Sequence, residues 1–313
     1  MQNARDFLTP DALSMLQAIA KAGSFAAAAR EMGMVPSALT YRVRQMEDAL
    51  DVLLFDRSSR QARLTEAGSE LLREGTRLLT EIDAVANRVK RVATGWESQF
   101  TIAVDTIISR STVMELCDAF YQLAPPTRIR LRDETLSGTL DALTSGQADL
   151  AIGAGPDSAT AADLHSKPLG NVTFVYAVAP HHPLAHAPEP LSDAVIQKHR
   201  AVAVADSVQR GGGQTFGLLA GQDVFTVASM QAKLDAQLRG MGGGNVPLCM
   251  ANAFIDTGRL VVKKTERGQR QVSVHYAWRG GKSNTSGRAL QWWLQQLESP
   301  ATRAALLENH RSM

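Results

Sequence analysis

The sequence has little cysteine, which bounds its chemistry at the outset. There are 2 cysteines in 313 residues, Cys117 and Cys249, far apart in the chain and both in apolar surroundings. No cysteine or histidine falls at the spacing of zinc ligands. We therefore expect two buried thiols, with a redox-sensing pair as the weaker alternative.

Long apolar runs and a strong charge are also missing. No run reaches the roughly 18 residues of a membrane span, and the amino terminus MQNARDFLTPDAL lacks the apolar core of a secretory signal. These two absences predict a cytoplasmic protein with no membrane partner. A formal net charge of +2 does not by itself indicate nucleic acid, while 44% hydrophobic and 20% charged residues are typical of a globular chain with two or three domains.

The stretch 23–44, GSFAAAAREMGMVPSALTYRVR, predicts a helix-turn-helix. Ser24 is a favoured cap for the first helix, Gly33 breaks the helical period, and Pro36 suits the first turn of a second helix. The second helix has one apolar stripe, formed by Leu39, Val43, Met46 and Leu50. Its other face has hydroxyl, aromatic and guanidinium groups that suit base edges and phosphates, namely Ser37, Thr40, Tyr41 and Arg44. A small helical bundle with a polar surface is the alternative.

A basic segment follows the helix-turn-helix. Arg57, Arg60 and Arg63 lie in a stretch that has no acidic residue. A short hairpin here would be a wing that contacts phosphates or a minor groove; a solvated loop is the alternative. The predicted DNA-binding residues are Ser24, Pro36, Ser37, Ala38, Thr40, Tyr41, Arg42, Arg44, Arg57 and Arg60.

Residues 65–94 contain no proline and predict one long amphipathic helix of about 28 residues, or about 42 Å. Its apolar positions are Leu71, Leu72, Leu78, Leu79, Ile82, Val85, Val89 and Val92. Such a stripe is too long to be buried on the small domain before it, so we expect it to pair with the same helix of a second subunit. Packing against the later domain is the alternative, because Gly68 and Gly75 weaken the helix.

From residue 99 onwards, strands alternate with helices, which predicts an α/β domain with a parallel sheet. The expected strands are 100–104, 127–131, 149–152, 173–179, 201–205, 225–227 and 272–278. The expected helices are 109–123, 136–145, 229–240 and 286–297.

Signals of catalysis are weak. His181, His182 and His186 are close together, but four prolines surround them, and we expect a solvent-exposed loop rather than a metal site or general base. Of the two glycine runs, 211–213 predicts a mobile loop and 242–244 a close approach of the backbone to a ligand or helix. Neither has the pattern of a nucleotide-binding loop. We expect no enzyme activity, no metal and no cofactor.

Several spaced motifs together resemble one family. The helix-turn-helix is followed by the pairs Met46-Glu47, Leu54-Phe55, Asp56-Arg57, Leu64-Thr65 and Ala67-Gly68. In this order they resemble the amino-terminal domain of LysR-type transcriptional regulators. The resemblance continues through LDALTSGQADLAIGAG and QLRGMGGGNVPLCMANAFIDTGRLV, and so covers essentially the whole chain. The chain departs from the family at Val35 and Pro36, where Ser or Thr followed by Gln is usual, and at Tyr41. The base sequence recognised therefore cannot be transferred from relatives.

The resemblance implies an organisation and partners. A winged helix-turn-helix DNA-binding domain would occupy 1–64, a linker and dimerisation helix 65–94, and a two-lobed α/β effector-binding domain, similar to periplasmic binding proteins, 95–313. The expected partners are double-stranded DNA, a small-molecule effector, further copies of the chain in a homodimer or homotetramer, and RNA polymerase. A solute-binding-like protein without a DNA role is the alternative, although it would need a signal peptide.

Ligands of α/β sheets bind beyond the carboxyl ends of the strands. That rule and the resemblance predict effector contacts at Asp105, Thr106, Ile107, Thr135, Leu136, Ser137, Val204, Gly244 and Asn245. An acid at position 105 would repel an anionic group, which favours a ligand that presents hydrogen-bond donors, such as a hydroxylated aromatic. The alternative is that Asp105 caps the following helix.

Overall fold

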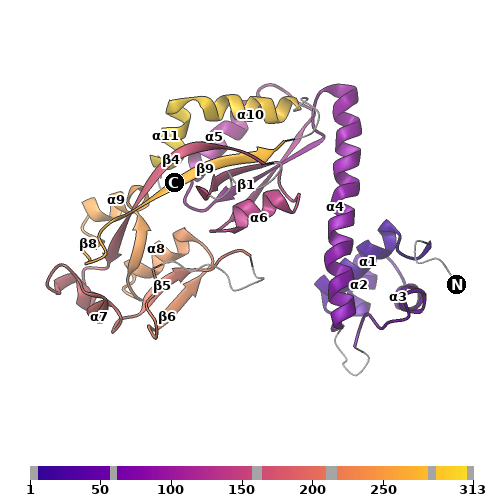
Figure 1. The fold of residues 1–313 in the computed structure, drawn as a ribbon, viewed down its shortest axis with the longest axis horizontal. Helices are drawn as coiled ribbons and strands as arrows, with labels where there is room; N and C mark the ends of the chain where they lie inside the picture. Colours follow the sequence, from indigo (N-terminus) through magenta and orange to yellow (C-terminus); the bar gives the residue numbers. More distant parts are fainter. Residues whose placement is uncertain (1–5, 57–61, 157–163, 209–216, 281–286, 309–313) are drawn as a thin grey trace. The chain divides into compact units, whose positions relative to one another are not determined.

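The structure is a computed structural model that describes residues 6–56, 62–156, 164–208, 217–280 and 287–308 (Figure 1). The chain divides into two compact units, Met1–Val89 and Lys90–Met313. In the described ranges no single helix is long and apolar enough to cross a membrane, and only the bent pair α1 and α2 passes that test by length and composition.

The first unit is built on three short helices, α1 (Pro10–Ala22), α2 (Phe25–Glu31) and α3 (Pro36–Leu50). Ser24 caps α2 by accepting a hydrogen bond from the Ala27 amide, and Pro36 occupies the first turn of α3, both as predicted. The predicted stripe of α3 faces the core: Leu39, Val43 and Met46 are buried and Leu50 is half-buried. A bridge between Phe55 and Leu64 forms the base of a hairpin.

The long helix α4 (Glu66–Thr94) begins against this core, where Leu71 and Leu72 pack. A Cβ at Gly68 would lie 2.0 Å from the Leu54 carbonyl oxygen, and one at Gly75 would lie 2.9 Å from Leu13 Cδ2. These glycines therefore let α4 approach the rest of the unit closely, which corrects their interpretation as mere points of weakness.

The second unit has a mixed sheet rather than the parallel sheet predicted. Among its described strands, β1 pairs parallel with β2 and β3, whereas β9 pairs antiparallel with both β3 and β4. The strands of this sheet are β1 (Gln99–Asp105), β2 (Arg128–Glu134), β3 (Leu150–Ala154), β4 (Leu164–Val178), β7 (Gly244–Pro247), β8 (Val261–Lys263) and β9 (Arg270–Arg279).

Helices cover both faces of this sheet (Figure 1). On β1, Ile102 and Val104 face the main core with α5 (Arg110–Tyr121) and α10 (Arg288–Glu298), while Ala103 faces α6 (Gly138–Thr144). This alternation is the period of two expected of a strand covered on both sides. Leu123, the last residue of the helix predicted over 109–123, is exposed just past the end of α5.

A smaller parallel pair, β5 (Ala201–Val204) and β6 (Val224–Val227), forms a second lobe with α8 (Met230–Leu238). Short elements that the sequence did not predict complete the unit: η3 (Pro183–His186), α7 (Asp193–Ile196), α9 (Leu248–Asp256), α11 (Pro300–Glu308), β7 and β8. We call the part built on β1, β2 and β3 the first lobe, and the part built on β5, β6 and β7 the second lobe.

One loop prediction is wrong in part. His181 and His186 are exposed, but His182 is buried, and its Nδ1 accepts a hydrogen bond from the Leu184 amide. Its ring lies 5.3 Å from that of His199, and burial together with these neighbouring imidazoles lowers the pKa of His182. His182 therefore stabilises the turn before η3 as a neutral ring.

Candidate functional site

The outer face of α3 carries most of the residues predicted to meet DNA. Tyr41 is 63% exposed, and Ser37, Arg42 and Arg44 are exposed beside it. Thr40 is half-buried, and its hydroxyl donates to the Pro36 carbonyl at 2.9 Å. The methyl group of Thr40 therefore remains available for an apolar contact. The remaining members of the set are exposed Pro36, half-buried Ala38 and half-buried Ser24, whose hydroxyl is already the α2 cap.

Glu47 holds the base of the hairpin through its side-chain carboxylate. The sequence did not predict this positioning role. Its Oε1 accepts hydrogen bonds from the amides of Leu54, at 2.8 Å, and Phe55, at 3.3 Å. The Asp56 amide donates to the Arg63 carbonyl at 2.8 Å, which closes the strand pair. Arg63 is exposed, while the predicted wing residues Arg57 and Arg60 lie outside the described residues. The signal for Glu47 was its place next to Met46, at the end of the buried stripe.

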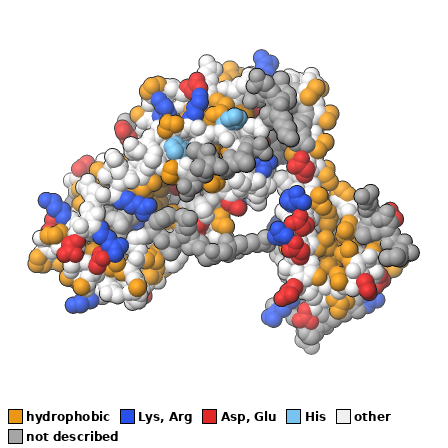
Figure 2. All heavy atoms as spheres, in the orientation of Figure 1, with side chains coloured by type: hydrophobic (Ala, Val, Ile, Leu, Met, Phe, Trp, Pro, Cys, Tyr) orange, Lys and Arg blue, Asp and Glu red, His pale blue; other side chains and the backbone are white. Residues whose placement is uncertain are grey.

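Beyond its first turns, α4 has an uncovered apolar stripe. Apolar side chains gather along the helix in Figure 2, and five described ones are about half exposed or more: Leu78, Ile82, Val85, Val89 and Val92. They recur at steps of three and four residues, so they share one face of the helix. An apolar stripe of this length in water calls for a partner surface.

In the second unit, Asp105 ties together two loops that follow parallel strands. Its Oδ1 accepts from the Ile107 amide at 2.9 Å, and its Oδ2 accepts from the Leu136 amide at 3.1 Å. Leu136 has a φ of 56°, a strained conformation for a residue with a side chain. Ser109, not Asp105, caps the following helix α5. Asp105 is thus a loop-tying acid, and the cap alternative is wrong.

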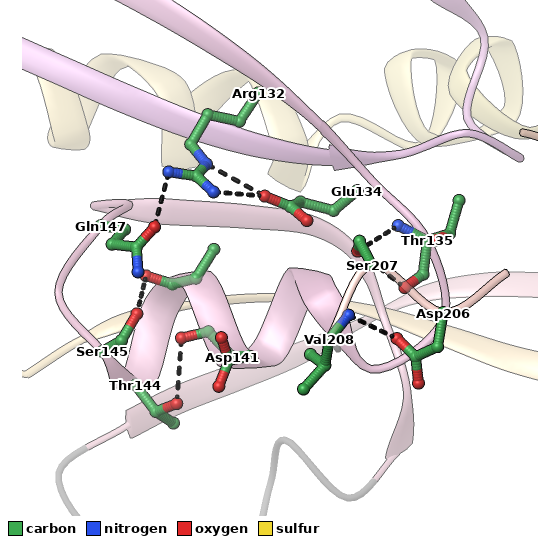
Figure 3. Close-up of polar contacts among 11 residues, drawn as sticks. Arg132, Glu134, Thr135, Asp141, Thr144, Ser145, Gln147, Asp206, Ser207 and Val208 are labelled. Carbon is green, nitrogen blue, oxygen red and sulfur yellow. Dashed lines mark hydrogen bonds and ion pairs between the residues drawn. The ribbon is translucent and has the colours of Figure 1, made fainter. Parts of the chain in front are cut away.

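Burial raises the pKa of Asp105 to about 7, against the opposing effect of its two amide donors. The nearby charges of Asp206 and Glu134 raise this pKa further. Glu134 is itself buried and accepts from Arg132 Nε at 3.0 Å, and Arg132 also donates to Gln147 (Figure 3). The site therefore gathers three carboxyl groups, and that of Asp105 changes charge near neutral pH.

The loop after β2 is hydrogen-bonded to the loop after β5, which joins the two lobes. Thr135 Oγ1 donates to the Ala205 carbonyl at 2.6 Å. The Thr135 amide donates to Ser207 Oγ at 3.0 Å, as Figure 3 shows. Ser137 Oγ donates to Asp206 Oδ2 at 2.5 Å. The hydroxyl groups of Thr135 and Ser137, both predicted to contact effector, are therefore engaged with the protein here.

The other predicted effector residues lie nearby. Thr106 Oγ1 accepts from the Met230 amide at 3.4 Å, which links the loop after β1 to the start of α8. Ile107 and Val204 are buried, and Gly244 and Asn245 are half-buried on β7. Within the described ranges, no hydrogen bond connects Gly244 or Asn245 directly to the loops after β1 and β2.

Lys233 is a polar residue that the sequence reading missed. It lies on the buried face of α8 together with Met230, Leu234 and Gln237. The spacing of these residues at steps of three and four was a signal for its burial. Among the described residues there is no group of three or more His, Cys, Asp or Glu side chains that could hold a metal.

Two family models match the chain: "Bacterial regulatory helix-turn-helix protein, lysR family" over residues 10–69, and "LysR substrate binding domain" over residues 93–301. One similar protein is the "Uncharacterized HTH-type transcriptional regulator YeeY" of Escherichia coli strain K12, 36% identical over 287 residues, which are 92% of each chain. Another is the "Probable HTH-type transcriptional regulator YhaJ" of the same strain, 35% identical over 93% of this chain and 96% of that protein.

Two solved structures share the fold. CbnR, described as a LysR family transcriptional regulator, has a TM-score of 0.58 at 19% identity, covering 93% of this chain and 98% of its own. The full-length virulence activator AphB of Vibrio cholerae has a TM-score of 0.54 at 17% identity, with the same coverage. The folded parts thus follow one another in the same order in all three chains.

Proposed function

The chain belongs to the LysR family of bacterial transcriptional regulators, and from that premise we propose which of its residues meet DNA, effector and a second copy of the chain. As a member of this family it is a ligand-responsive regulator that binds DNA through its helix-turn-helix. Because its target is DNA, we expect it to act in the cytoplasm.

The DNA-binding part of the proposal has α3 in a major groove. The observation that carries it is the exposed face of α3, on which Tyr41 and Arg44 stand clear of the core beside Ser37. Guanidinium and phenol groups on a recognition helix are suited to base edges. The basic hairpin, with Arg57, Arg60 and Arg63, would then contact phosphates.

We propose that residues 1–64 bind DNA, residues 65–94 form the dimer interface and residues 95–313 bind the effector. The exposed stripe of α4 supports pairing of two copies along this helix. Effector bound near Asp105, Leu136 and Gly244 would alter the contact between the loops after β2 and β5, and through it the angle between paired recognition helices. A changed angle alters the bend of the DNA and the access of RNA polymerase.

For the effector, the sequence hypothesis is a ligand rich in hydrogen-bond donors, such as a hydroxylated aromatic. Three carboxyl groups on the loops after β1, β2 and β5 support it, those of buried Asp105 and Glu134 and half-buried Asp206, because they disfavour an anionic group at that end of the site. Ile107 and Leu136 would supply apolar walls.

Gel-shift assays with the DNA next to the protein's own gene test the proposal. We expect binding of the wild-type chain to weaken steeply with salt. Replacing Tyr41 or Arg44 with Ala should relax base preference, at a cost of about 1 to 3 kcal/mol for each lost base contact. Asp48→Ala, on the exposed part of the same helix, is the matched control. Equal preference among operator variants for wild type and both test variants would show that α3 does not read the bases.

A further inference from the structure

Lys233 is a buried residue whose amine has no partner among the described residues. It lies on α8 and is 6% exposed. Two further buried residues of this helix are Leu234, at 1% exposed, and Gln237, at 0%. No hydrogen bond or ion pair of its Nζ is found in the part of the chain that the structure describes. Lysine is almost never fully buried unless it is paired, and an unpaired buried ammonium is strongly unfavourable.

The amine lies over a glycine that leaves room for it. A Cβ at Gly244 would lie 3.2 Å from Lys233 Nζ and 3.2 Å from the Val202 carbonyl oxygen. Gly244 itself is half-buried. Any larger residue at position 244 would fill the space beside the amine.

Lys233 lies where β5 and β7, after one bridge between them, pair with different strands. We call this place the fork. The bridge between Ala201 and Gly243 joins β5 to β7, and the Val202 amide donates to the Gly243 carbonyl at 2.9 Å. Beyond that point β5 continues with β6, while β7 continues with β4.

The fork borders the loops already assigned to the effector. Met230, one turn before Lys233 on α8, donates its amide to Thr106. Val204, Met230 and Leu234 belong to the apolar cluster that also contains Ile107. The surroundings of the amine are therefore apolar, and burial alone lowers the pKa of Lys233 to about 8, which still leaves most of the group charged at neutral pH.

We propose that Lys233 binds a carboxylate of the effector, which makes the effector a small organic acid with an apolar body. This inference rests on the proposed effector site. A carboxylate at the fork would supply the missing partner through charge-assisted hydrogen bonds. The carboxyl groups around Asp105 disfavour a second anion beside them and leave that part of the site for hydroxyl donors. A hydroxylated aromatic monocarboxylate meets both conditions.

The test measures binding of acids and their neutral amides to the full-length protein by calorimetry. The probes are benzoate, 4-hydroxybenzoate and phenylacetate, each paired with the corresponding amide. Wild type should bind at least one acid in preference to its amide. Lys233→Met should weaken that acid about ten- to a hundredfold and leave amide binding unchanged, while Lys233→Arg keeps a charge and should retain part of the preference. Lys198→Met, an exposed lysine, should bind as wild type does.

Three outcomes overturn the inference. Acids and amides bind equally well, or the Met variant keeps the full preference for the acid, or none of the acids binds. A melting temperature for Lys233→Met at or above that of wild type shows that the variant is folded, since removing an unpaired buried charge does not destabilise. The proposed function stands or falls separately, because operator binding in gel shifts needs none of these probes.

Discussion

At the scale of single residues, Asp105 makes the loops after β1 and β2 sensitive to pH. Its pKa is about 7 in the folded protein, against an ordinary value of 3.8, and burial is the main cause. Between these two values the folded protein holds a proton that the unfolded chain has lost. The stability therefore falls as the pH rises through this window, by up to about 1.4 kcal/mol per pH unit.

Asp105→Asn removes this titration and leaves an amide oxygen to accept one backbone amide. We expect wild type to lose stability between pH 5 and pH 7, as measured by denaturant midpoints, and the Asn variant to change less over the same range. Asp118→Asn, at an exposed position on α5, serves as the control and should follow wild type. Parallel curves for wild type and Asp105→Asn would mean that Asp105 titrates in its ordinary range.

The same residue shows how far residue chemistry can be predicted from sequence. The apolar run before it was enough to predict that Asp105 lies at the end of the first strand. Its partner, the Leu136 amide, comes from another loop, and no local pattern contains that contact. Lys233 was missed for the same reason, since its environment is made by Gly244 and Val202 from other strands.

At the scale of elements, α4 depends on a glycine where it leaves the hairpin. A Cβ at Gly68 would overlap the Leu54 carbonyl, which is backbone and cannot rotate away, whereas the nearest atom at Gly75 is Leu13 Cδ2, the end of a flexible side chain. We expect Gly68→Ala to lower the melting temperature and the DNA affinity, because the clash outweighs the gain of about 1 kcal/mol in helix propensity.

Gly75→Ala is the matched control, with the same substitution in the same helix. It should change the melting temperature less, because Leu13 can shift by a few tenths of an ångström. Thermal unfolding of both variants beside wild type decides the matter. If Gly68→Ala proved as stable as Gly75→Ala, the close packing of α4 on Leu54 would not matter for folding.

Helices and strands could be predicted from the sequence where the residues of the segment itself mark its ends. Ser24 and Pro36 marked helix starts, and the apolar run at 100–104 gave β1 to within a residue or two. The sheet was predicted as parallel because strands alternate with helices, but β9 returns from the far end of the chain and pairs antiparallel with β3 and β4. Strand partners depend on the path of the whole chain, which periodicity does not encode.

At the scale of the whole molecule, the order of motifs along the chain was the strongest indication of the family. A DNA-binding and a substrate-binding family model both match this one chain. A regulator of this kind reads two half-sites with two copies of its recognition helix, so assembly is a condition of tight binding. In the described part of the chain, the α4 stripe is the apolar surface that we assign to this assembly.

The last prediction tests that assignment with a double variant, Ile82→Glu with Val85→Glu. Both side chains are close to half exposed in the single chain, at 48% and 46%, so the change should leave the fold of one copy intact. In a dimer that pairs along α4, the same change would bury four carboxylates in an apolar seam, a penalty of several kcal/mol. We expect light scattering to show loss of the linker dimer, and gel shifts to show loss of operator binding. Asp83→Lys, on an exposed position off the stripe, controls for altered charge and should keep both. An unchanged mass together with unchanged DNA affinity would remove α4 from the dimer interface and leave its apolar face to another partner.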